Sequence, residues 1–185
     1  MPVTALATAR SALGAIPVGP ADLDRPIPCA EFDVRGLPTH VVGWHHVFAA
    51  CLAGTAAPGD PTHVLLDPVA DLRVSSRLLL DALDTAPDEA ELPYRGRTPV
   101  PLLVTELVAE TVLHGWDLAT ALAAPFAPFA VDGPVLAEAE RGPALLRGEV
   151  FAAEAFHPAA GTGVGAGGLP GLVARSGRDP GWRPS

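Results

Sequence analysis

Apolar residues recur every three or four positions in several stretches of the chain, and prolines and glycines separate these stretches. Such spacing places the apolar side chains on one face of a helix. No stretch alternates apolar and polar residues for long enough to predict a strand, so we expect a mainly α-helical protein. The predicted helices span residues 3–15, 33–53, 67–86, 99–124 and 132–155.

Residues with strong preferences for helix ends mark several of these boundaries. Asp33 is a good N-cap for the second helix, and Gly54 is a good C-terminal stop for it. Asp67, followed directly by a proline, is typical of the first turn of the third helix. The Gly-Pro pair at 142–143 is expected to split or kink the fifth helix.

The segments between the helices are rich in Pro, Gly and Asp. Residues 16–29 predict an ordered but irregular connector, and residues 55–66 and 88–98 predict a loop and a linker. The glycine run at 161–168 is interpreted as a flexible loop, because no strand precedes it and no Gly-Lys-Ser/Thr follows it as in a phosphate loop. The final tail carries three apolar residues for docking on the helices, Leu172, Val173 and Trp182.

Four long helices joined by such loops predict an all-α four-helix bundle with an additional short C-terminal helix and an irregular tail. The 185 residues suit one domain, 1–185, in which residues 157–185 form a Gly/Pro-rich tail. Hydrophobic residues make up 49% of the chain and charged residues 18%, which is a globular composition and excludes disorder for most of it.

The charge balance excludes one class of partner. All 12 basic residues are arginines, and against 21 acidic residues they leave a net charge of −9. A nucleic acid would be repelled, because affinity for its phosphates requires excess positive charge. We therefore expect a small-molecule substrate and no nucleic acid, in a protein that is a monomer or a homodimer.

Cysteine use and the N-terminal sequence bear on the compartment. Cys29 and Cys51 are too few for a disulfide framework and do not form a CxxC pair. The N-terminus has no basic segment ahead of an apolar run, and no stretch approaches the roughly 20 apolar residues of a membrane span. These features predict a cytoplasmic protein with no membrane partner.

The fourth predicted helix carries titratable groups on an apolar stripe. Glu110, His114 and Asp117 follow each other at helical spacing and share a face with four apolar residues, Leu103, Leu107, Leu118 and Ala121. A carboxylate in such a place must be neutralised by a proton, a counter-ion or a metal. Because Glu110 and His114 are four residues apart, both can reach one divalent ion.

A third ligand is expected from the buried stripe of the second helix, which offers His40. Two neutral imidazoles and one carboxylate suit Zn²⁺, with Ni²⁺ and Fe²⁺ as alternatives, and they leave positions open for water or substrate. Trp44, one turn after His40, is expected to project into the cavity, and we assign substrate binding to it and to Phe48.

Plainer interpretations of the same residues stay open. Glu110 is also explained by a buried ion pair with an arginine, and His114 alone by a core histidine with its hydrogen bonds satisfied. The case for His40 is weaker, because a proline two residues earlier leaves the helical phase undecided. We interpret His45 and His46 as histidines of the surface or the rim.

Four short blocks of the sequence resemble a known family. They read PCAEFDVR at 28–35, THVVGW at 39–44, ETVLHGWDLA at 110–119 and GRDP at 177–180. In this order they are similar to the actinobacterial metal-binding branch of the DinB-like superfamily, which includes mycothiol-dependent maleylpyruvate isomerase and related thiol transferases. The block at 110–119 is the most specific of the four.

The resemblance implies a four-helix bundle whose divalent ion is held by His40, Glu110 and His114. In that family the ion is thought to activate a low-molecular-weight thiol such as mycothiol, as co-substrate, for transfer to or isomerisation of a small electrophile. Asp117 is the candidate catalytic residue: it either orients a ligand imidazole or a bound water, or acts as a general base. A hydrogen bond from Asp117 to a neighbouring helix is the plainer alternative.

Two other functions remain in competition with thiol activation. One is a thiol-independent isomerase, cyclase or lyase of specialised metabolism that keeps the metal. The other is a non-catalytic metal-binding protein whose ion holds the bundle together.

Overall fold

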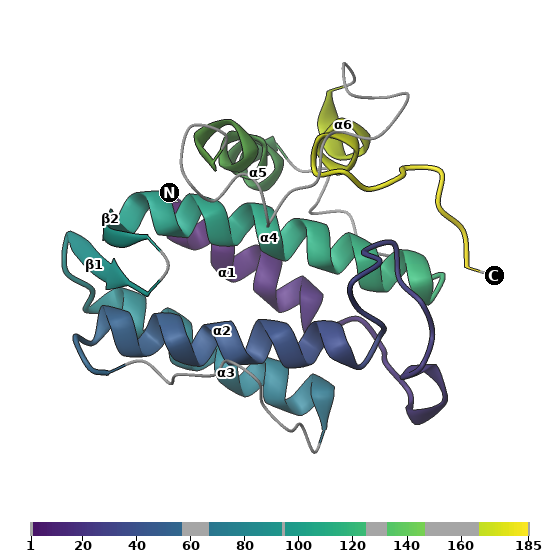
Figure 1. The fold of residues 1–185 in the computed structure, drawn as a ribbon, viewed down its shortest axis with the longest axis horizontal. Coiled ribbons are helices and arrows are strands. Elements are labelled where there is room, and N and C mark those ends of the chain that lie inside the picture. Colours follow the sequence, from purple (N-terminus) through teal and green to yellow (C-terminus); the bar gives the residue numbers. More distant parts are fainter. Residues whose placement is uncertain (1, 57–66, 94, 125–132, 147–166, 185) are drawn as a thin grey trace.

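Helices make up most of the described structure (Figure 1). The computed structural model describes residues 2–56, 67–93, 95–124, 133–146 and 167–184. Its helices are α1 (Pro2–Leu13), a 3₁₀ turn (Pro20–Asp22), α2 (Gly36–Leu52), α3 (Pro68–Asp84), α4 (Val100–Ala121), α5 (Gly133–Leu146) and α6 (Gly168–Arg175). The predicted all-α class is confirmed.

Helices α2 and α4 lie at the centre of the molecule (Figure 1). Helix α2 packs along α3, whereas α1 packs along α4. In Figure 1, α2 and α4 run in opposite directions, and α5 and α6 lie on the side of α4 away from α2. Within the described ranges, no helix combines the length and the apolarity needed to cross a bilayer.

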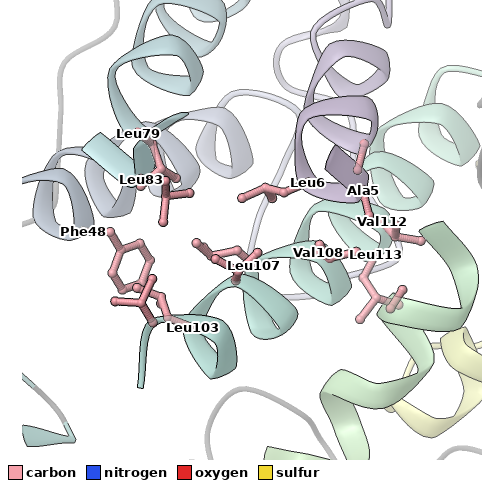
Figure 2. Packing of buried hydrophobic residues seen from close by; sticks show 14 of the residues in the cluster. Ala5, Leu6, Phe48, Leu79, Leu83, Leu103, Leu107, Val108, Val112 and Leu113 are labelled. Carbon is pink, nitrogen blue, oxygen red and sulfur yellow. The ribbon is translucent and has the colours of Figure 1, made fainter. Parts of the chain in front are cut away.

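The core that holds these helices together consists of aliphatic side chains and one phenylalanine. Figure 2 shows Phe48 of α2 near Leu103 and Leu107 of α4, with Leu6 of α1 and Leu79 of α3 close by. These residues are at most 3% exposed. Each such burial contributes about 1.5–3 kcal/mol relative to exposure, so the core fixes how α2 and α4 face each other.

The start of α2 differs slightly from its predicted position. The helix begins at Gly36, three residues after Asp33. The Asp33 carboxylate nevertheless caps the N-terminus of α2, because Oδ1 accepts hydrogen bonds from the backbone N–H groups of Arg35 (3.1 Å) and Gly36 (2.6 Å). At the other end, Gly54 has φ +66°, the left-handed conformation that favours glycine after a helix.

The prediction of a linker without strands over residues 88–98 was wrong. Strands β1 (Glu89–Leu92) and β2 (Gly96–Pro99) pair antiparallel there, with Ala90 opposite Thr98. Ala90 and Leu92 face the core while the two glutamates of β1 are exposed. Each strand has only four residues, too few for alternation to stand out in the sequence.

The Gly-Pro pair at 142–143 is predicted to split or kink α5; the helix is not split, because α5 continues through this pair to Leu146. Gly142 serves packing: a Cβ atom at this position would lie 2.5 Å from the Cβ of Ala109 on α4. The predicted remainder of the helix up to residue 155 lies outside the described residues, as do most of the loop at 55–66 and of the glycine run at 161–168.

The C-terminal tail docks on the helices as predicted. Leu172 and Val173 of α6 are completely buried in the main core. Trp182 packs against a second apolar cluster that includes Ile27, Val34 and Leu118. The irregular connector after α1 is ordered by the same cluster.

Candidate functional site

A pocket lies between α1, α2 and α4. Helix α2 contributes His40, Trp44 and Phe48 to its lining, and α4 contributes Glu110 and His114. The three predicted ligands and both predicted substrate-binding residues therefore share one pocket. Asp117 does not line it.

The two candidate histidines face each other across this pocket. The ring centroids of His40 and His114 are 5.9 Å apart, with the ring planes at 80°. Glu110 lies one turn before His114 on α4. Among the described residues, however, no three His, Cys, Asp or Glu side chains are placed closely enough to hold a metal ion as they stand. Metal binding by these residues stays a prediction.

The donor groups themselves fit a divalent ion. Nδ1 of His114 is buried and makes no hydrogen bond within the described structure, and it lies 3.5 Å from Oδ2 of Asp117. A carboxylate behind one imidazole nitrogen leaves Nε2 to act as the ligand, which is the usual arrangement at metal-binding histidines.

Both histidines are held in the neutral form that binds metals. Burial lowers the pKa of His40 to about 4, and the neighbouring His114 adds to the effect. Burial also lowers the pKa of His114. At neutral pH no proton has to leave these imidazoles before a metal binds.

Glu110 is a half-buried carboxyl group that forms no ion pair with any described residue. Burial, followed by the charge of Glu106, raises its pKa to about 8. The alternative of an arginine paired with this carboxylate is not what the described residues show: Arg10 lines the same pocket, but no arginine among them forms a salt bridge with Glu110. Near neutral pH, the metal-free carboxyl group therefore keeps its proton.

Asp117 forms an ion pair with Arg178 of the C-terminal tail. Nε and Nη2 of Arg178 donate hydrogen bonds to its two oxygens at 2.8 Å each, and Nη1 donates to Oγ of Ser176 at 3.1 Å. Burial opposes ionisation of Asp117, but its contacts with His114 and Arg178 hold its pKa below the usual value. The plainer alternative for Asp117 was a hydrogen bond to a neighbouring helix; its partner is instead Arg178, in the tail after the end of α6. A direct catalytic role for Asp117 stays a prediction.

Aromatic rings form one wall of the pocket. Trp44 stacks on Phe48 with centroids 5.4 Å apart, and the His40 ring contacts Trp44 at 6.4 Å. The His40 ring also contacts Phe32, with centroids 4.8 Å apart, a residue that the sequence did not single out. The wall supplies apolar surface next to the candidate ligands.

The interpretation of His45 as a surface or rim residue was wrong. Its side chain is 1% exposed, and Nδ1 lies 2.8 Å from Oγ of Ser75 on α3. Helix α3 covers the second face of α2, so a histidine on that face is also buried. His46 is half-buried.

Sequence reasoning also missed Arg10, a buried residue of α1 that lines the pocket. It follows Leu6 by four positions and precedes Leu13 by three, so it lies on the apolar face of α1. An arginine in the middle of such a stripe was a signal in the sequence.

The fold and the site together define a DinB-like helical domain with candidate metal ligands on facing helices. The chain belongs to the mycothiol maleylpyruvate isomerase N-terminal domain family, whose model matches residues 4–119, more than half of its length. The match covers α1 to α4 and the hairpin, whereas α5, α6 and Arg178 lie beyond it. Comparisons with curated proteins and with solved structures give no significant match.

Proposed function

We propose that the protein is a metal-dependent enzyme that activates a low-molecular-weight thiol of the mycothiol type for transfer to, or isomerisation of, a small electrophile. His40, Glu110 and His114 would hold the ion, Zn²⁺ first, with Ni²⁺ and Fe²⁺ as alternatives. The observation that carries the proposal is that these three side chains line one pocket while the Glu110 carboxyl group has no ion pair among the described residues. Membership of the family supports it.

The residues of the chain have distinct tasks in this proposal. A bound divalent ion would lower the pKa of a coordinated thiol, so that the thiolate is the nucleophile. The neutral imidazoles of His40 and His114 bind without losing a proton, and Glu110 gives up its own. Asp117, held by Arg178, fixes the His114 ring.

Metal content tests the ligand set directly. We expect the purified protein to bind one equivalent of Zn²⁺, and His40→Ala, Glu110→Gln and His114→Ala each to lower that stoichiometry or the affinity, measured by elemental analysis and chelator competition. His46→Ala, on the same helix but outside the pocket lining, is the matched control. Unchanged zinc binding by all three variants would exclude this ligand set.

Turnover with and without thiol tests the chemistry. We expect conjugation of chlorodinitrobenzene to mycothiol to exceed the uncatalysed rate, and to be lost in the chelator-treated protein and restored by metal. Turnover of an electrophile that needs metal but no thiol would contradict thiol activation and support a lyase or isomerase. A protein that unfolds on chelation and catalyses neither reaction would instead support a structural metal.

A further inference from the structure

Arg10 is a buried cation whose hydrogen-bonding groups are poorly used. Its side chain is 4% exposed, and it lines the pocket from α1. Its Nε makes no hydrogen bond within the described structure, and Nη1 lies 3.5 Å from Nδ1 of His45, at the limit of hydrogen-bond distance. A guanidinium group has five N–H donors, so most of its capacity has no acceptor in these residues.

His45 does not fill this need. Nδ1 of a neutral imidazole offers at most one lone pair, and this atom already lies 2.8 Å from Oγ of Ser75. Glu110 faces the same pocket, but its carboxylate forms no salt bridge with Arg10. Burial lowers the pKa of Arg10 to about 9, with Glu110 opposing the shift, so the group is still a cation at neutral pH.

Two other arginines, the buried Arg178 and the exposed Arg73, show what a purely structural role looks like. Arg178 makes two 2.8 Å hydrogen bonds to Asp117. Arg73, on α3, donates from Nε to the backbone oxygen of Gly14 at 2.9 Å. Arg10 lacks such a protein acceptor at short distance, although it is among the most buried of the described arginines. A cation removed from water without an acceptor is costly, which indicates an acceptor that comes from outside the chain.

We propose that Arg10 forms the anion-binding end of the pocket and receives the carboxylate of a small ligand whose apolar part lies against Trp44 and Phe48. The planar fork of a guanidinium group matches a carboxylate with two parallel hydrogen bonds. The single positive charge of Arg10 is balanced by a monoanion, whereas a phosphate dianion would leave one negative charge uncompensated. The inference deepens the proposed function, on which it rests for the role of the pocket, by naming its substrate class as an organic monocarboxylate.

Binding of simple carboxylates to the metal-free protein tests the inference without any thiol or metal. Benzoate and its neutral analogue benzamide have the same shape, and calorimetry measures both. We expect benzoate to bind the wild-type protein about tenfold more tightly than benzamide, because only benzoate gives Arg10 a charged acceptor. Equal affinities, or no benzoate binding by the folded protein, would overturn the proposal.

Substitutions locate the charge. Arg10→Gln is expected to weaken benzoate binding about tenfold or more and to leave benzamide binding unchanged, and Arg10→Lys is expected to fall between the two. Arg77→Gln, an exposed arginine of α3, is the matched control. Benzoate bound equally well by folded Arg10→Gln would contradict the proposal. If that variant does not fold, the wild-type comparison and Arg10→Lys still decide.

The outcome is separable from that of the metal hypothesis. A protein that prefers benzoate but binds no metal would support the anion site and contradict the proposed thiol chemistry. A protein that binds zinc through His40, Glu110 and His114 but does not distinguish benzoate from benzamide would keep the enzyme and lose the anion site.

Discussion

Individual residues in the pocket respond to pH in opposite directions. The folded protein holds a proton on Glu110 up to a pKa of about 8, whereas an exposed glutamate loses it near 4.5. His40 behaves in the reverse sense, because burial lowers its pKa from 6.5 to about 4. A pH series on the wild-type protein alone would mix these effects, so a variant that isolates one of them is needed.

Glu110→Gln isolates the carboxyl group. Between pH 4.5 and about 8, the folded wild-type protein binds one proton more than the unfolded chain at this position. The stability that Glu110 contributes is therefore present below 4.5 and is lost as pH rises towards 8. In chelator-treated protein, the stability of wild type relative to Glu110→Gln is expected to fall by up to about 1.4 kcal/mol per pH unit in this window. Urea unfolding measures it; parallel pH curves would show that Glu110 is not protonated in the folded state.

The Asp117 to Arg178 pair predicts a large effect of a small substitution. Asp117→Asn leaves a buried guanidinium group without its counter-charge, and we expect a loss of about 3–5 kcal/mol in the free energy of unfolding. The matched control is Glu89→Gln, which breaks the exposed pair with Arg97 and should cost less than about 1 kcal/mol. Similar losses in both variants in denaturant titrations would contradict this account.

At the scale of elements, local sequence signals predicted where the helices lie, whereas the burial of several side chains depends on contacts between elements. The caps Asp33 and Gly54 act within a few residues, so the limits of α2 could be read to within three positions. The burial of His45 depends on α3 packing against the second face of α2, which no local pattern encodes. The pocket itself could be anticipated through the spacing of Glu110 and His114. The apolar stripe of α1 could have marked Arg10 as a buried residue, but not which pocket it lines.

The contact between α4 and α5 is a second feature of element packing that can be tested. Gly142→Ala would place a Cβ atom 2.5 Å from the Cβ of Ala109, so the two helices must move apart. We expect a loss of about 1–3 kcal/mol in stability, from chemical denaturation. Gly133→Ala, in the same helix with no atom within 4 Å of the added Cβ, should change stability little.

A compensating substitution checks the cause. Ala109→Gly removes the atom that Gly142→Ala meets, so the double variant should recover part of the loss once the cost of a helical glycine is subtracted. Additive effects of the two substitutions would show that close approach is not the reason.

At the scale of the whole molecule, the site extends beyond the family domain. The matched region ends at residue 119, yet Arg178, 61 residues beyond Asp117, holds the carboxylate that lies behind His114. Leu172 and Val173 anchor α6 in the main core and so carry Arg178 to this position. The tail is therefore connected to the pocket through three side chains, Arg178, Asp117 and His114.

This connection predicts that a change in the tail alters metal binding. Arg178→Gln is expected to lower hydrogen-exchange protection of residues 168–182 and to weaken zinc binding about tenfold or more, because Asp117 and with it His114 lose their support. Arg175→Gln, which removes the 3.5 Å contact with Glu140 outside the pocket lining, should leave zinc affinity unchanged. Loss of tail protection without any change in zinc affinity would mean that the tail stabilises the bundle but does not position the His114 ring.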